Sequence, residues 1–233
     1  MQVVLYWCKE RLRDALLWPL NLVRDFPARS GRLATTLLTG GKALLLAPLF
    51  IWQAIGKQTF RHESRRWAQQ IGIWLHLLLV QLFDMIGGPE VCQLVMHLGM
   101  HTTPLTAAER TAVQSIFGPN NLRYQDVRVA QGGILNLIFR YNGGLAFATW
   151  YTIHVPRVEN AVSKKGGNGR DNLSLLVHEL THVFQYHHVG SRYLGEAIYY
   201  LVTTQRTCYQ YGGVAGLQLC LQQGKLFRQF NRE

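Results

Sequence analysis

The sequence predicts an α+β protein in which a basic, helical N-terminal region precedes a smaller region with a short sheet and a helix that carries a motif. Up to about residue 101, apolar residues recur at helical spacing and strand signals are nearly absent. After residue 102 a helix-capping signature, a stretch of period-two alternation and a further helical stretch follow in turn. The 233 residues are 48% hydrophobic, enough to fill a folded core. We therefore expect two regions, 1–101 and 102–233.

The first apolar stretch of the N-terminal region has the pattern of an amphipathic helix. Leu5, Leu12, Leu16 and Leu20 recur at helical spacing, and basic residues fall between them. Phe26-Pro27 is expected to end this helix, because proline interrupts the helical hydrogen-bond pattern.

Two further apolar stretches, 33–56 and 71–85, suggest contact with a membrane. The uncharged run after Lys42 is shorter than the roughly 20 residues that a spanning helix needs, and it contains Pro48. The basic segment 61–66 precedes the last stretch, an arrangement that suits the boundary of lipid headgroups. Interfacial attachment is the favoured interpretation of 33–86. A true span and a helical layer packed on the rest of the protein are the alternatives.

The charge and the cysteines narrow the class of partner and the compartment. The net charge of +11 is shared by both halves of the chain, which is typical of an anionic membrane partner and argues against a nucleic-acid partner. Four scattered cysteines predict neither a zinc ribbon nor a disulfide framework. Charged residues interrupt the N-terminus where a signal peptide would be apolar. We expect a protein of the cytoplasmic side of a membrane, attached peripherally.

The second region should begin with a helix and continue into a small sheet. Thr106 and Glu109 form a capping-box signature for a helix that runs to about Phe117. Period-two alternation then predicts strands at 127–129, 134–141 and 145–155, with Asn142-Gly143 as a hairpin turn between the last two. A Gly/Lys-rich loop, 163–170, follows the sheet.

A helix expected over 172–188, capped by Asp171, contains the motif H-E-x-x-H. His178 and His182 are four residues apart, so one helix face presents both imidazoles to a single metal ion. Glu179 is rotated away from that pair, but it can reach a metal-bound water and take its proton. The spacing therefore predicts a Zn2+ site with Glu179 as the catalytic carboxylate.

The third metal ligand has two candidates. His188 stands where the last histidine of a longer motif would stand, but Gln185 replaces the glycine that turns the chain there. Glu196 follows the turn at Gly190 on a second helix and is the favoured ligand. We expect His187 at the surface and His154 at the edge of the cleft. Three tyrosines are candidate helpers for the developing oxyanion: Tyr186, Tyr193 and Tyr200.

The stretch Leu176–Tyr186 resembles the HE-[LM]-THV-x-Q segment of bacterial zinc metallopeptidases, including Vgr-related proteins and the injection-system core domain. The similarity extends over roughly 103–233 through short matches such as Thr152–Pro156 and Tyr209–Tyr211. It implies a zincin-like domain in which His178, His182 and Glu196 bind zinc and Glu179 acts in catalysis. Such chains usually continue beyond Asn-Arg-Glu, so a terminal helix of the family is expected to be absent.

The favoured function is a membrane-associated zinc metallopeptidase that acts on a peptide or protein. The alternative is a catalytically inactive zincin-like module that binds a partner in a secretion or envelope system. In that case the zinc would be structural, with a fourth protein ligand closing the site. A weaker third interpretation is an effector whose N-terminal helices disturb bilayers while the zinc domain processes it.

Overall fold

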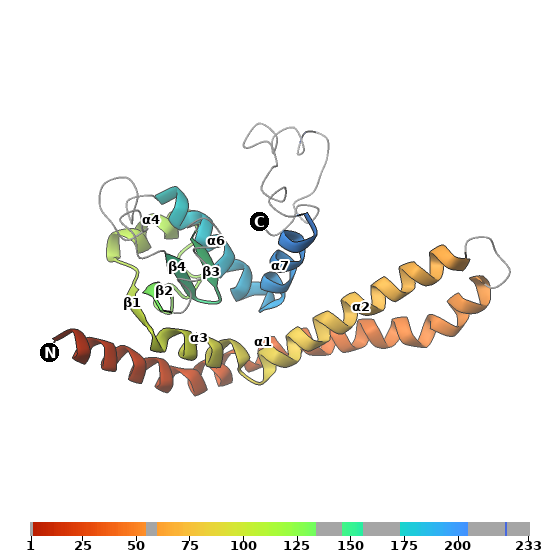
Figure 1. The fold of residues 1–233 in the computed structure, drawn as a ribbon, viewed down its shortest axis with the longest axis horizontal. Coiled ribbons are helices and arrows are strands. Elements are labelled where there is room, and N and C mark those ends of the chain that lie inside the picture. Colours follow the sequence, from red (N-terminus) through yellow and green to blue (C-terminus); the bar gives the residue numbers. More distant parts are fainter. Residues whose placement is uncertain (1, 55–59, 134–145, 156–172, 205–221, 223–233) are drawn as a thin grey trace.

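The computed structural model describes residues 2–54, 60–133, 146–155, 173–204 and 222, which form six helices and a four-stranded sheet (Figure 1). The helices are α1 (Gln2–Ala54), α2 (Phe60–Met85), α3 (Gly88–Leu98), α4 (Ala107–Phe117), α6 (Leu173–Val189) and α7 (Arg192–Thr204). The strands are β1 (Met100–Pro104), β2 (Arg128–Gly132), β3 (Phe147–Thr149) and β4 (Thr152–Val155). The predicted α+β class and the helical N-terminal region are confirmed.

The sheet is mixed and has the strand order β1-β2-β4-β3. β2 pairs with β1 antiparallel and with β4 parallel, and β3 pairs with β4 antiparallel. The sequence did not reveal β1, which begins at Met100 and pairs with β2 as far as Arg128. The sheet therefore starts two residues before the region boundary expected at residue 102, and β1 crosses that boundary.

The expected single strand 145–155 is wrong, because a tight turn divides it into β3 and β4. Thr149 pairs with Thr152, so Trp150 and Tyr151 form the turn, and Trp150 has a φ of 53°. The turn is held by α7 and the residue before it: the Trp150 amide donates to Tyr193 Oη at 2.9 Å, and its indole donates to Ser191 Oγ at 3.0 Å. Two aromatic residues gave no turn signal in the sequence, and these tertiary contacts stabilise the conformation.

Several sequence expectations are met, and others fall outside the described residues. Thr106 and Glu109 form both hydrogen bonds of the capping box at the start of α4. β2 matches the strand expected near 127–129. The expected strand 134–141, its turn at Asn142-Gly143, the loop 163–170 and the cap Asp171 lie outside the described residues.

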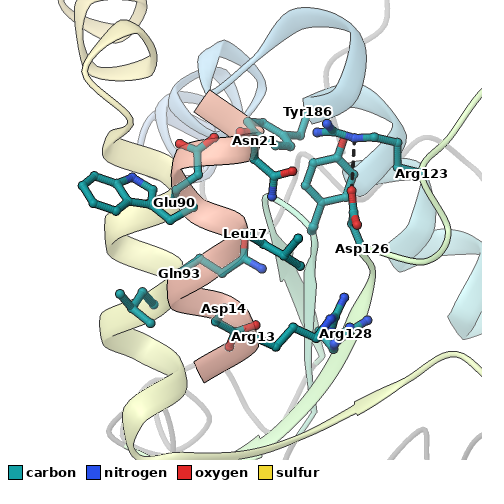
Figure 2. A pocket seen from close by; sticks show the side chains of 13 residues that line it. Arg13, Asp14, Leu17, Asn21, Glu90, Gln93, Arg123, Asp126, Arg128 and Tyr186 are labelled. Carbon is teal, nitrogen blue, oxygen red and sulfur yellow. Dashed lines mark hydrogen bonds and ion pairs between the residues drawn. The ribbon is translucent and has the colours of Figure 1, made fainter. Parts of the chain in front are cut away.

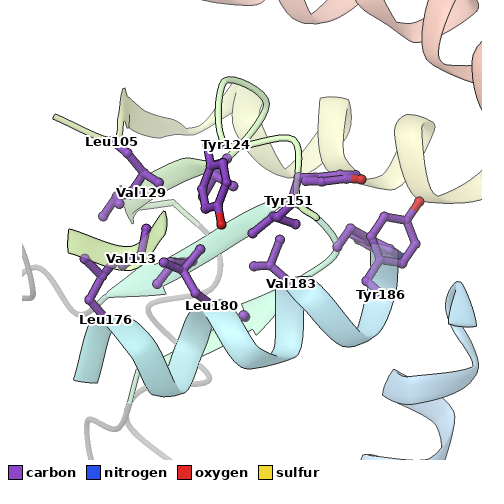
Figure 3. Close-up of a cluster of buried hydrophobic side chains, with 14 of the residues drawn as sticks. Leu105, Val113, Tyr124, Val129, Tyr151, Leu176, Leu180, Val183 and Tyr186 are labelled. Atoms are coloured by element: carbon purple, nitrogen blue, oxygen red, sulfur yellow. The ribbon is translucent and has the colours of Figure 1, made fainter. Parts of the chain in front are cut away.

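The hydrophobic core lies between the sheet and α6. Leu176, Leu180 and Val183, spaced four and three residues apart, form one face of α6 and are fully buried against the sheet residues Val129 and Ile153. Figure 3 shows these α6 side chains pointing toward the strands, with Val113 of α4 beside them. This packing fixes the rotation of α6, and therefore determines where its remaining residues, including the motif, can point.

The predicted end of the first helix at Phe26-Pro27 is wrong, because α1 continues through Pro19, Pro27 and Pro48. Proline costs a helix roughly 3 kcal/mol, so other contacts must offset the loss. Partly buried ion pairs hold α1 on both sides of Pro27: Asp25 binds Arg123 of the body, and Arg29 binds Glu90 of α3. Tertiary contacts therefore override the local signal.

α1 and α2 form a long antiparallel hairpin, half of which extends beyond the sheet and its helices (Figure 1). The two helices meet where Trp74 lies against Gly40 and donates its indole N–H to the Thr36 carbonyl at 2.7 Å. Within the described part of the chain, no single helix is long and apolar enough to cross a membrane. α2 and α3 together pass that test as a pair bent by 67°.

Candidate metal site

The two motif histidines lie together on one side of α6. The ring centroids of His178 and His182 are 5.2 Å apart and the rings are nearly perpendicular, at 86°. His178 is exposed, whereas His182 is buried. Because the core face of α6 is turned toward the sheet, the four-residue spacing leaves both rings on the flank of the helix. The predicted pairing of these imidazoles is present in the structure.

His182 is held in the state that a metal ligand requires. Burial lowers its pKa below the ordinary value, so the imidazole is neutral at pH 7, although a hydrogen bond with Gln185 acts in the opposite direction. Its Nδ1 lies 3.1 Å from Gln185 Oε1, which places the proton on Nδ1 and leaves the Nε2 lone pair for a ligand. Gln185, noted in the sequence only as a missing glycine, therefore orients the ring.

The carboxylate of the motif lies inward of the histidine pair. Glu179 is 2% exposed and stands on α6 between the core residue Leu180 and His178. The strands β3 and β4 pack against α6. The sequence predicted that Glu179 is rotated away from the imidazoles, and the structure agrees. Its burial is greater than a carboxylate open to a cleft would show.

Glu196, the favoured third ligand, lies on α7 as predicted, but its carboxylate is engaged elsewhere. Arg192, one turn before it, donates Nε to Glu196 Oε1 at 2.6 Å. Among the described residues, no three His, Cys, Asp or Glu side chains lie close enough together to hold a metal ion. The structure therefore brings His178 and His182 together but does not bring Glu196 to them.

The alternative third ligand, His188, lies away from the pair. α6 is unbroken to Val189, and His188 Nδ1 bonds to the Phe184 carbonyl of the same helix at 2.9 Å. His187 is half-buried, and its Nδ1 accepts from the Tyr151 hydroxyl at 2.5 Å. His154, expected at a cleft edge, is buried within the sheet and bonds Thr149 Oγ1 through Nε2 at 2.6 Å. These positions fit structural roles for all three histidines.

The candidate helper tyrosines are placed differently from one another. The ring of Tyr193 is 6.3 Å from that of His182, but its hydroxyl bonds to the β3–β4 turn, donating to the Ala148 carbonyl at 3.1 Å. Tyr186 is buried against Tyr151 and lines cavities on the α1 side of α6. Tyr200 is part of α7, but its side chain lies outside those described.

No family model, curated protein or solved structure matches this chain. The resemblance to zinc metallopeptidases therefore stays a prediction from the motif residues.

A charged cluster that the sequence did not predict joins α1 to the body of the protein. Arg123 binds both carboxylate oxygens of Asp25 at 2.8 Å and donates Nε to the Tyr151 hydroxyl at 2.8 Å. Figure 2 shows Arg123 beside Asp126 and Tyr186 in a cavity of about 50 Å³ between α1, α3 and the sheet. A second cavity of about 140 Å³ adjoins Arg123 and Tyr186. Neither cavity is lined by a motif residue.

A second unpredicted cluster is the hydrogen-bonded series Asp14–His97–Thr152. His97 Nδ1 donates to Asp14 Oδ2 at 2.8 Å, and its Nε2 accepts from the Thr152 hydroxyl at 2.9 Å. His97 and Thr152 are fully buried, Asp14 is half-buried, and the series ties α1, α3 and β4 together. The residues are 83 and 55 positions apart in sequence, and no local pattern could have indicated their contact.

Proposed function

We propose that this protein is a zinc-dependent metallopeptidase, with His178 and His182 as zinc ligands and Glu179 as the general base. The observation that carries the proposal is the pair of imidazoles one turn apart on α6, with the tautomer of His182 set by Gln185. Neutral imidazoles with a lone pair on one nitrogen are the donors that zinc prefers. The two described side chains therefore fit the metal.

Glu196 is the third ligand in this proposal. Its carboxylate pairs with Arg192, a neighbour on the same helix whose side chain is 43% exposed, and such pairs contribute little stability. Release of the carboxylate from Arg192 thus costs far less than a zinc–carboxylate bond provides. Arg192 then acts as a competing partner that keeps Glu196 from the site until a metal is present.

The bound zinc would polarise a peptide carbonyl and acidify the attacking water. The Glu179 carboxylate accepts the proton of that water and passes it to the amine nitrogen as the C–N bond breaks.

The decisive comparison is wild type against Glu179→Gln, both loaded to equal zinc content. Mass spectrometry of a peptide library should show cleavage by wild type and a loss of roughly 100-fold or more in the variant. Equal turnover in the two proteins would remove the general base from the proposal. His188→Ala, on the same helix, is the matched control and should cleave as wild type does.

A non-catalytic zinc module is the second candidate, and the burial of Glu179 favours it. This alternative predicts zinc binding through His178 and His182 with no hydrolysis by either protein in the library assay. Wild type and Glu179→Gln would then bind zinc with equal affinity. Four protein ligands around the zinc in X-ray absorption would assign the site to this structural class.

A further inference from the structure

The helix α1 turns its charged side toward the rest of the protein and its apolar side toward solvent, which is the reverse of the usual arrangement. Its acidic residues all face the protein body, each against a basic partner: Glu10 with Arg128 at 3.4 Å, Asp14 with His97 at 2.8 Å and Asp25 with Arg123 at 2.8 Å. Arg11 and Arg29 are also buried on this side. The charged face of α1 is therefore the covered one.

The uncovered face of α1 is largely apolar in both halves of the helix. Among its exposed large apolar side chains, one set in each half recurs at spacings of three, four or seven residues, which places that set on one side. The sets are Leu5, Leu12, Leu16, Leu20, Val23 and Phe26 in the first half, and Leu38, Leu45, Leu49 and Trp52 in the second. Leu45 and Trp52 are 80% and 78% exposed.

The same kind of stripe continues on the returning helices. On α2 and the turn after it, Leu75, Leu79, Leu82 and Ile86 are exposed at spacings of four, three and four. On α3, Val91, Val95 and Leu98 are exposed at spacings of four and three. We call the exposed apolar residues just given, on α1, α2 with its following turn, and α3, the apolar stripe. Exposed apolar side chains in this number mark a surface that binds a membrane or another protein.

The charge around the apolar stripe selects between these partners. Between Asp25 and Asp84 the sequence holds seven Lys or Arg residues and one acidic residue, Glu63, a net charge of +6 out of the total of +11. Of the basic side chains, Lys42, Arg61, Arg65 and Arg66 are exposed. A second copy would place two such positive surfaces together, whereas anionic lipid headgroups complement them.

We propose that the apolar stripe docks this protein on an anionic lipid surface. In this arrangement α1 and α2 lie along the headgroup boundary, and the body of the protein stays in the aqueous phase. The leucines enter the acyl region, and the exposed basic residues contact the headgroups. Zinc chemistry plays no part in this docking, so it stands or fails independently of the proposed peptidase activity.

Flotation of the full-length protein with vesicles tests the docking. We expect binding to phosphatidylcholine vesicles that contain roughly 25% phosphatidylserine, and much weaker binding to phosphatidylcholine alone or in high salt. Leu45→Glu/Leu49→Glu should lower binding by roughly tenfold or more, since both leucines would otherwise be buried among the acyl chains. Arg65→Gln/Arg66→Gln should lower binding to the mixed vesicles by roughly tenfold and leave the weak binding to neutral vesicles unchanged.

Ile116→Glu is the matched control, because Ile116 lies on α4 and its exposure of 55% is close to that of Leu49, 57%. This variant should bind as wild type does, and circular dichroism should show equal helicity in all four proteins. Equal binding by the leucine variant, or none by wild type, would overturn the proposal. The proposal would also be overturned if wild type formed oligomers without vesicles and the leucine variant did not. The apolar stripe would then bind a second copy of the protein. If the bound protein resists a carbonate wash, it spans the bilayer, and docking on the surface is wrong.

Discussion

The buried histidine of β4 makes the stability of the fold depend on pH. His154 is 1% exposed, stacks on Phe147 at 4.9 Å and has no hydrogen-bond partner for Nδ1 among the described residues. Burial lowers its pKa to about 3, from an ordinary value near 6.5. The folded protein therefore keeps this ring neutral at a pH where the unfolded chain takes up a proton. Stability must fall as the pH drops below about 6.5, and the loss ends near pH 3.

The size of the effect follows from this difference in pKa. pH 5 is about 1.5 units below the ordinary pKa of histidine, and each unit corresponds to about 1.4 kcal/mol. Protonation of this site in the unfolded chain therefore lowers the free energy of unfolding by about 2 kcal/mol at pH 5 relative to pH 7.5. For a chain of 233 residues this loss lowers the melting temperature by roughly 4–8 °C. Raised pKa values of the buried Asp14 and Asp84 act in the opposite direction, because folding favours their protonated forms.

A comparison of variants isolates the contribution of His154. Thermal unfolding at pH 7.5 and pH 5 is measured for wild type and for His154→Gln, which keeps a polar group within reach of Thr149. The fall in melting temperature between the two pH values should be smaller in the variant by roughly 4–8 °C, whatever its absolute stability. His62→Gln, at an exposed position on α2, should show the same fall as wild type. An unchanged fall in His154→Gln would refute the reasoning.

Three further predictions follow from the core, the end of α6 and the third ligand. Leu180→Ala should lower the free energy of unfolding by roughly 2–5 kcal/mol in urea titration, since this side chain is fully buried, and a loss below about 1 kcal/mol would contradict the packing. Gly190→Ala should cost roughly 1–3 kcal/mol, because its φ is +69° and an added Cβ would lie 2.1 Å from Asp84 Oδ2. Gly31→Ala, with nothing within 4 Å, should cost nothing in the same assay. Glu196→Gln should weaken zinc binding in calorimetry by roughly tenfold or more, whereas Arg192→Ala should maintain or strengthen it; equal affinities in all three proteins would exclude Glu196 as a ligand.

Local patterns predicted the elements whose signals are local. The capping box of Thr106 and Glu109, the period-two residues of β2 and the apolar spacing of α6 each depend on neighbours in sequence, and each element is present. The turn at Trp150 was missed because Tyr193 and Ser191, more than 40 residues away, stabilise it. The continuity of α1 through Pro27 likewise depends on Arg123 of the body.

The amphipathic pattern of α1 shows a different limit. Sequence periodicity correctly separated an apolar from a charged side, but it does not state which side the rest of the protein covers. The usual assumption places the leucines inward. Here Asp14 and Asp25 face inward because His97 and Arg123 are buried opposite them.

At the candidate site, the helix spacing predicted the histidine pair, because four residues define one helix face. The ion pair of Arg192 with Glu196 has the same spacing of four and was predictable on the same principle, although it was missed. The hydrogen bond between His182 and Gln185, three residues apart, is equally local. The depth of Glu179 was not predictable, since it depends on how α6 packs against β3 and β4.

The central claim is that His178 and His182 bind one zinc ion together, and metal titration by calorimetry tests it most directly. Purified protein stripped of metal should bind about one zinc per chain, and His178→Ala or His182→Ala should abolish that binding while His188→Ala retains it. Absence of zinc binding by wild type, or retention of it when both imidazoles are removed, would contradict the account.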